Sequence, residues 1–215
     1  MTGQPERAGA APARHFSLLR GFHLADWFTL ANGFCGMAAV MAAMEFLQSG
    51  STKVLGLAMA LLPAALLFDV LDGRIARWRQ RASAMGRELD SLADVISFGV
   101  APAAIGYACG LQGGWDIAIL LAFVACGLSR LARYNVSAEE LSAATGKVTY
   151  FEGTPIPTST LLVGILAIAL WQGAIGEALW FGSLRLGPWQ LHPLALMFAL
   201  SGALMVSRTI RIPKP

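Results

Sequence analysis

Residues 69–94 carry the sequence DVLDGRIARWRQRASAMGRELDSLAD, a basic segment with a pair of aspartates at each end. Apolar runs border this segment on both sides, over residues 54–68 and 95–111. Acidic side chains at membrane depth are energetically costly, so they mark a functional site by default. The stretch therefore predicts two membrane helices joined by a short basic connection, with an acidic site where the two helices meet.

The composition of the whole chain indicates a membrane protein. Of its 215 residues, 56% are hydrophobic and 13% are charged, and the mean hydropathy is +0.59. A soluble domain carries about 25% charged residues, so this chain has too little polar surface to coat a soluble core. These values exclude a soluble enzyme and a disordered chain. The three cysteines, an odd number inside apolar runs, exclude a secreted disulfide scaffold.

Apolar stretches of about 20 residues are long enough to cross a bilayer, and they predict an all-α, polytopic membrane bundle of six transmembrane helices. We expect these helices over residues 27–47, 54–71, 89–111, 115–133, 155–172 and 191–206. An amphipathic segment, residues 14–26, predicts a preceding helix in the membrane interface; the alternative is an extension of the first span. Residues 1–13 predict a disordered cytoplasmic tail, and residues 14–212 a single transmembrane domain.

The distribution of basic residues predicts the orientation of the bundle. Cytoplasmic loops hold an excess of Lys and Arg. With the N-terminus in the cytoplasm, all but two of the 16 basic residues lie inside, and only Lys53 and Arg185 lie outside. Both termini and the acidic site would then face the cytoplasm, in a cell (inner) membrane. Topology and attraction to anionic membrane lipids explain the basic excess, so we expect no nucleic-acid partner.

The four aspartates are expected to converge. Each pair has helical spacing, so its two carboxylates share one face, and the short connection makes the two helices antiparallel neighbours. Four carboxylates in a partly dry site repel one another unless cations neutralise them. Oxygen ligands without His or Cys favour Mg²⁺ or Mn²⁺, and four carboxylates suit two ions that bridge a phosphoryl group. The alternative is that the aspartates pair with neighbouring arginines as ordinary interfacial charges.

The aspartates belong to a longer pattern, Asp69-x2-Asp72-Gly73-x2-Ala76-Arg77-x8-Gly86-x3-Asp90-x3-Asp94. This pattern resembles, at every fixed position, the motif of the CDP-alcohol phosphotransferase family. The segments TLANGFCG, ELDSLADVISFGVAPA, SRLARYN and FEGTPIP resemble its bacterial phosphatidylserine synthase branch, over residues 29–157, whereas the last two spans resemble the family only in hydropathy. The resemblance implies a homodimer and metal-dependent transfer of a phosphatidyl group from CDP-diacylglycerol to the hydroxyl of L-serine, with release of CMP.

Roles for individual residues follow from that resemblance. It implies that Asp94 is the general base that takes the proton of the serine hydroxyl. The implied ligands of the metal ions are Asp69, Asp72, Asp90 and Asp94. The implied contacts to CDP-diacylglycerol are Asn32, Asp72, Gly73, Ala76, Arg77, Ser83 and Gly86. The alternatives are tight helix packing for the small residues of this set and an interhelical hydrogen bond for Asn32.

Serine specificity requires a group that binds the carboxylate of an amino acid, which an arginine can hold with two hydrogen bonds. Arg130 and Arg133, at the cytoplasmic end of the fourth predicted span, are the candidates for serine binding, and Asn135 follows them in the chain. The alternative is that the two arginines anchor the span by reaching the lipid headgroups.

Other functions remain open at this point. A sister enzyme of the same fold would use inositol phosphate, glycerol phosphate or choline; choline favours an aromatic cage, and the cytoplasmic sequence offers Tyr134 and Tyr150 but no dense cage. A small cation transporter would explain intramembrane aspartates, but not Arg77 and the small residues at fixed offsets. A structural membrane subunit would tolerate alanine at all four aspartates.

Overall fold

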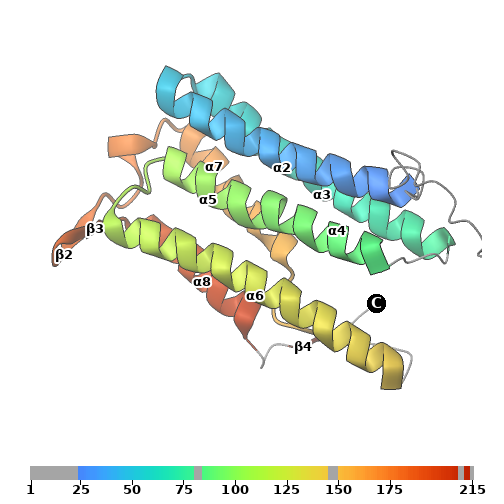
Figure 1. The fold of residues 1–215 in the computed structure, drawn as a ribbon. Helices are drawn as coiled ribbons and strands as arrows, with labels where there is room; N and C mark the ends of the chain where they lie inside the picture. Colours follow the sequence, from blue (N-terminus) through green and yellow to red (C-terminus); the bar gives the residue numbers. More distant parts are fainter. Residues whose placement is uncertain (1–23, 80–83, 145–149, 208–210, 214–215) are drawn as a thin grey trace, which may run out of the picture.

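The computed structural model of the protein describes residues 24–79, 84–144, 150–207 and 211–213. Over these residues, long helices lie side by side along one axis (Figure 1). The α-helices are α2 (Leu24–Ser49), α3 (Thr52–Arg79), α4 (Ala84–Asp94), α5 (Ala101–Ala108), α6 (Gly114–Ala144), α7 (Thr160–Trp171) and α8 (Leu196–Val206). The shorter helical segments are the π-helix η1 (Val95–Val100) and the 3-10 turns η2 (Ile156–Ser159), η3 (Gly176–Ala178) and η4 (Pro193–Ala195).

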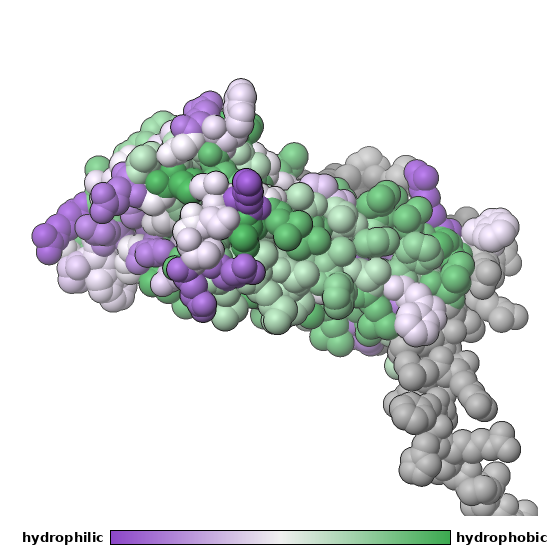
Figure 2. All heavy atoms as spheres, turned by 90° about the horizontal axis from the view of Figure 1, so that it is seen from above, coloured by the Kyte–Doolittle hydropathy of each residue, from purple (hydrophilic) through white to green (hydrophobic). Residues whose placement is uncertain are grey.

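Four helical stretches in the described part of the chain are long and apolar enough to cross a membrane. They are Leu24–Ser49, Thr52–Ile75, Met85–Ala108 and Gly114–Val136, and two shorter apolar helices follow at Ile156–Trp171 and Pro193–Val206. Figure 2 shows hydrophobic residues over the middle of one face of the molecule and hydrophilic residues toward its ends. This arrangement is the one expected of a protein that crosses a bilayer more than once.

The expectation of a purely helical fold was incomplete, because two small antiparallel sheets accompany the helices. The paired strands are β1 (Tyr150–Glu152) with β4 (Arg211–Pro213), and β2 (Leu184–Leu186) with β3 (Trp189–Leu191). The β2–β3 hairpin is held against the start of α6: Trp115 Nε1 donates a hydrogen bond to the carbonyl oxygen of Leu186 at 3.0 Å, and the rings of Trp115 and Trp189 pack edge to face. Strands of three residues are too short to give a periodic signal.

Several helices extend past the predicted spans. As the lack of proline between residues 72 and 89 suggests, α3 continues to Arg79 and α4 already begins at Ala84. The helix α6 runs to Ala144, beyond the predicted end at residue 133, because residues 134–144 contain good helix formers and no glycine or proline. The predicted tail 1–13 and most of the predicted interfacial helix, residues 14–23, lie outside the described residues.

Small side chains let α2 and α3 pack closely along their length. Ala39 and Ala43 on α2, and Ala58 and Ala65 on α3, are fully buried or nearly so, and such residues allow helix backbones to approach within a membrane. The close packing of α2 on α3, and of α4 on α2, gathers the ends of three helices at one end of the bundle. The aspartates of the predicted acidic site lie there.

A buried aspartate stabilises the opposite end of the bundle. Asp116, in the first turn of α6, is fully buried and accepts hydrogen bonds at 2.8 Å from the backbone N–H groups of Gly113 and His192. Its Oδ2 also lies 2.6 Å from Nδ1 of His192. A carboxylate in a first helical turn interacts favourably with the helix dipole. These contacts join α6 to the segment before α8 and give His192 a structural partner.

Candidate metal centre

Helices α3 and α4 bring three aspartates together. Asp69 and Asp72 on α3 and Asp90 on α4 each offer one carboxylate oxygen, and these three atoms all lie within 4.8 Å of one another. Asp72 is buried, and the other two are half-buried. We refer to Asp69, Asp72 and Asp90 as the aspartate cluster. Three of the four aspartates that the spacing was expected to bring together thus form one group.

The chemistry of the aspartate cluster fits a hard divalent cation. Three carboxylates at this separation repel one another when all are ionised. The Oδ1 atom of Asp90 is buried and has no hydrogen-bond partner among the described residues, and a buried acceptor without a partner is destabilising. A cation would relieve both costs. An all-oxygen ligand set is the one that Mg²⁺ and Mn²⁺ prefer, so these residues could hold either ion.

Asp94 lies beside the aspartate cluster and differs from its members. Its side chain is 7% exposed, and it interacts electrostatically with all three carboxylates of the cluster. Its Oδ1 accepts a hydrogen bond from Nδ2 of Asn32 at 3.1 Å. The group of oxygens within 4.8 Å of one another does not include an atom of Asp94. Asp94 therefore lies beside the three carboxylates that could hold a metal ion without being part of that group.

One face of α2 orients carboxylates from the two neighbouring helices. Thr29 Oγ1 donates a hydrogen bond to Oδ2 of Asp72 at 2.8 Å, and Asn32, one turn later, donates to Asp94. The hydroxyl of Ser97 in turn donates to the backbone carbonyl oxygen of Asn32 at 2.8 Å. Asn32 was among the predicted site residues, whereas Thr29 was not predicted. The signal for Thr29 was its spacing of three residues from Asn32, which places both on one helical face.

A backbone contact between α2 and η1 holds this arrangement. A Cβ atom added at Gly36 would run into the Oγ of Ser97 and would lie 2.6 Å from its Cα. We therefore expect Gly36→Ala to force the two segments apart and to lower stability by about 1–3 kcal/mol, as overpacking of a tight core does. Thermal unfolding in detergent measures this loss as a lower Tm.

The matched control for Gly36→Ala is Gly164→Ala on α7, where an added Cβ meets no atom within 4 Å. We expect this second variant to unfold at the temperature of the unmodified protein. Equal Tm values for the two variants would contradict the close approach of α2 and η1.

The structure describes only some of the side chains that were expected to contact CDP-diacylglycerol. At Gly73 an added Cβ would meet no described atom of a neighbouring segment within 4 Å. Open space beside Asp72 is compatible with close approach of a ligand, and it argues against tight helix packing as the reason for this glycine. Gly86 is half-buried in the first turn of α4. The backbone of Ala76 and Arg77 continues α3, and Ser83 lies outside the described residues.

Arg130 is the predicted serine-binding residue that interacts with an aspartate of the motif. Its side chain is 9% exposed, and its guanidinium interacts electrostatically with Asp94. The guanidinium carbon lies 5.9 Å from the centre of the Tyr134 ring. The buried Nε has no hydrogen-bond partner among the described residues, so the side chain has an N–H group still to satisfy.

The other two predicted serine contacts have partners within the protein. Arg133 Nη1 donates to the carbonyl oxygen of Val206 at 3.4 Å, at the end of α8. Asn135 Nδ2 donates to Oγ of Ser91 at 3.0 Å and to the carboxylate of Glu88 at 3.4 Å. These bonds join α6 to α8 and to α4, so Arg133 and Asn135 have partners on different helices.

Comparison with known proteins assigns the fold and site to a family. The model of the CDP-alcohol phosphatidyltransferase family matches residues 22–202. The CDP-diacylglycerol–serine O-phosphatidyltransferase of Saccharomyces cerevisiae is 45% identical over 204 residues, which are 94% of this chain and 74% of that protein. Proteins of the same name from Mycobacterium tuberculosis and Helicobacter pylori are 35% and 39% identical over 71% and 66% of this chain, which spans 52% and 56% of their lengths.

The family match also corrects the predicted extent of the resemblance. It was expected over residues 29–157, with only hydropathy in common beyond that point, but the match continues through α7 and into α8. The last two apolar helices are therefore part of the family's domain. With most of its residues matched and three of the four motif aspartates in one cluster, the chain belongs to the CDP-alcohol phosphatidyltransferase family.

Proposed function

We propose that this protein transfers a phosphatidyl group from CDP-diacylglycerol to the hydroxyl of L-serine, giving phosphatidylserine and CMP. The observation that carries this proposal is a buried arginine, Arg130, whose guanidinium interacts electrostatically with Asp94 beside the aspartate cluster. A group able to bind a carboxylate within electrostatic range of carboxylates able to hold a cation supports an amino acid as the acceptor. The names of relatives that are 35–45% identical support the same reaction.

In this mechanism the serine hydroxyl attacks the phosphorus atom that bears diacylglycerol. The new P–O bond forms while the P–O bond to CMP breaks, and the hydroxyl proton passes to Asp94. Asp69, Asp72 and Asp90 would hold one or two divalent ions, which would neutralise the diphosphate and the charge that develops on the leaving oxygen. The open space beside Gly73 lets the nucleotide approach the backbone of α3.

The hydrogen bond from Asn32 suits Asp94 to the role of general base. It fixes one carboxylate oxygen, Oδ1, and leaves the other oxygen to take the proton. A general base must lie within hydrogen-bond reach of the proton that it abstracts, so a fixed carboxylate beside the diphosphate site is an advantage. Burial of Asp94 also keeps water from competing with serine for this position.

Arg130 would bind the carboxylate of serine with the paired N–H groups of its guanidinium. We expect Arg130→Lys to raise the KM for serine about 10–100-fold, because a lysine cannot reproduce a two-point contact, and a hydrogen bond to a charged group contributes about 1.5–3 kcal/mol. The KM for CDP-diacylglycerol should change little. Steady-state kinetics with each substrate varied in turn separates the two effects.

Arg133→Lys is the control for Arg130→Lys, because Arg133 has a backbone partner at the end of α8. We expect a change of less than about threefold in the KM for serine, the size of a weakened surface contact. A normal KM for serine in Arg130→Lys, together with a reduced kcat, would contradict a role in carboxylate binding.

We also propose that the bundle crosses a cell (inner) membrane six times as a homodimer, with both termini and the aspartate cluster on the cytoplasmic side. The positive-inside distribution of charge supports this orientation. The two shorter apolar helices cover roughly 20–25 Å at 1.5 Å per residue, less than a hydrocarbon core of about 30 Å. Local thinning of the bilayer accommodates such a difference at modest cost.

Purified protein in detergent, with CDP-diacylglycerol and Mg²⁺ or Mn²⁺, tests the reaction. CMP release is followed with L-serine, inositol phosphate, glycerol phosphate or choline as the acceptor, and the lipid product is identified by mass. We expect release that depends on serine. Release of CMP with another alcohol alone would still support phosphatidyl transfer, but it would contradict serine as the acceptor. Membership of a transferase family argues against the cation transporter.

A further inference from the structure

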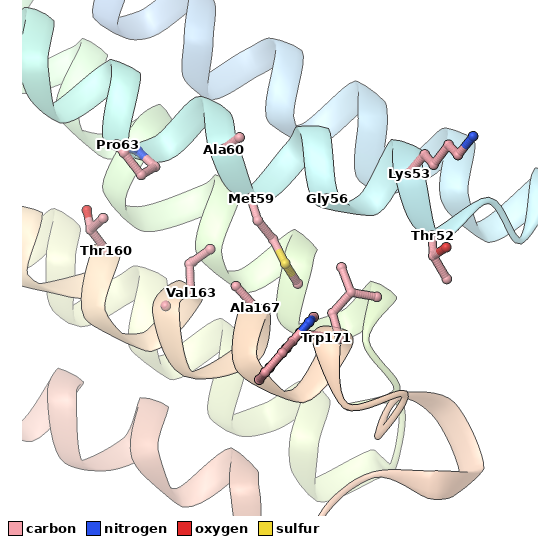
Figure 3. Close-up of a pocket in the computed structure, with 12 residues that line it drawn as sticks. Thr52, Lys53, Gly56, Met59, Ala60, Pro63, Thr160, Val163, Ala167 and Trp171 are labelled. Carbon is pink, nitrogen blue, oxygen red and sulfur yellow. The ribbon is translucent and has the colours of Figure 1, made fainter.

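A groove runs between α3 and α7, two of the apolar helices of the bundle. It has a volume of about 650 Å³. Figure 3 shows the side chains of Met59, Val163 and Ala167 between the two helices, with Thr52 and Trp171 at one end and Pro63 and Thr160 at the other. The catalytic arrangement proposed above uses none of these residues.

Glycines create the room in this groove. An added Cβ at Gly164 would meet no atom within 4 Å, and one at Gly56 would meet only Cδ2 of Leu170, at 4.0 Å. In the six-span topology proposed above, the groove opens toward the hydrocarbon of the bilayer, so water does not fill it. An empty groove would forfeit dispersion contacts along both helices. A flexible apolar chain is the occupant that restores these contacts.

The length and position of the groove match one leaflet of the bilayer. From Thr52 to Pro63 the helix rises about 16 Å at 1.5 Å per residue, which is half of a hydrocarbon core of about 30 Å. Asp69 and Asp72 lie further along the same helix, about 9 and 14 Å beyond Pro63. The groove therefore belongs to the leaflet opposite the aspartate cluster, so the lipid substrate with its diphosphate at the cluster is not its occupant.

The membrane-surface end of the groove carries a cation that can attract an anionic headgroup. Lys53 lines this end and is exposed, with its amino group on the side of α3 away from α7 (Figure 3), and Thr52 beside it adds a hydroxyl. No acidic residue is among the described residues that line the groove. Trp171 is 86% exposed there, and tryptophan rings favour the level of the headgroups. A lysine at this level attracts the phosphate of an anionic lipid.

We propose that this groove binds one acyl chain of an anionic phospholipid from the leaflet opposite the aspartate cluster, with the lipid phosphate at Lys53. The lipid is a bound component of the fold and is distinct from the substrate. The proposal rests on the depth of α3 in the bilayer and on the charge at its end, and it holds whichever alcohol the enzyme uses.

The fluorescence of Trp171 tests the proposal directly. The protein is reconstituted in two kinds of phosphatidylcholine vesicle, which contain the same fraction of a lipid with brominated acyl chains. This brominated lipid is phosphatidylglycerol in one kind and phosphatidylcholine in the other. Brominated chains quench tryptophan fluorescence on contact. The difference between the unmodified protein and Trp171→Phe gives the signal of this one residue. We expect brominated phosphatidylglycerol to bind with about fivefold preference, the effect of one lysine at a membrane surface.

Two charge variants and one groove variant decide the outcome. Lys53→Gln should abolish the preference for phosphatidylglycerol, whereas Arg185→Gln, which removes a cation outside the groove, should retain it. Gly164→Leu should reduce quenching of Trp171 by both brominated lipids, because its side chain fills the open space.

Equal quenching by the two lipids in the unmodified protein would overturn the proposal, because it would show no selection of an anionic headgroup. Absence of quenching by either lipid, with a change in oligomeric state in Gly164→Leu, would also overturn it and would assign the groove to a second copy of the chain.

Discussion

Asp94→Asn is expected to lower kcat for phosphatidyl transfer by about 10²–10⁴-fold, the usual contribution of a general base, while the protein stays folded. The amide has the shape of the carboxylate, and its oxygen can still accept the hydrogen bond that Asn32 donates at this position. It cannot, however, take the proton of the serine hydroxyl. CMP release at saturating CDP-diacylglycerol, serine and Mn²⁺ measures the loss, and the Tm in detergent verifies the fold.

A titration with metal separates the two roles that Asp94 could have. If Asp94 served only as a ligand, excess Mn²⁺ would restore the kcat of Asp94→Asn. If it is the base, kcat stays low at every concentration of metal. Glu45→Gln, a loss of the same charge at an exposed site on α2, is the control and should retain full activity. Restoration by metal would contradict the assignment of the base.

Local periodicity was enough to predict the aspartate cluster. Three- and four-residue spacings place carboxylates on one helical face whatever the rest of the fold does, and a short connection between two helices leaves them few arrangements other than antiparallel packing. Asp69, Asp72 and Asp90 are together for this reason. The long apolar runs predicted the four longest membrane helices in the same way, since their length follows from the thickness of a bilayer.

Partners that lie far apart in the chain could not be predicted by the same reasoning. Thr29 and Asp72 are 43 residues apart, and their contact depends on how α2 rotates against α3. The predicted serine contacts show the same limit: Arg130 and Arg133 have helical spacing, but Arg133 bonds to the end of α8 and Arg130 interacts electrostatically with Asp94. Helical spacing predicts a shared face, whereas the packing of neighbouring helices decides each partner.

The π-helical segment η1 is a second feature that could not be predicted from the sequence. It begins directly after Asp94, within the predicted span 89–111, which reads as one continuous apolar helix. A π-turn shifts the faces of the residues that follow it, and such turns occur frequently at functional sites. Here the shift accompanies the burial of Ser97 against Gly36 on α2. No pattern of hydropathy distinguishes this segment from an ordinary α-helix.

Thr29→Val is expected to weaken metal binding about 10–100-fold, the usual effect of removing a group that orients a ligand. Valine has the shape of threonine but donates no hydrogen bond, so Oδ2 of Asp72 would lose its partner at 2.8 Å. Asp72→Asn should have the larger effect, with no detectable transfer at metal concentrations that saturate the unmodified protein, because it removes a ligand. Calorimetric titration with Mn²⁺ measures binding independently of turnover.

Thr29→Ser makes this prediction specific to the hydroxyl, because serine can still donate to Asp72 and should bind Mn²⁺ almost as tightly as the unmodified protein does. A role of Thr29 in packing alone would give the reverse order, since valine fills the buried site beside α3 better than serine. Normal Mn²⁺ affinity in Thr29→Val, with a lower Tm in Thr29→Ser, would therefore contradict the orienting role. Weak binding in Thr29→Val that is restored in Thr29→Ser would show that α2, which provides no carboxylate to the cluster, sets its affinity for metal.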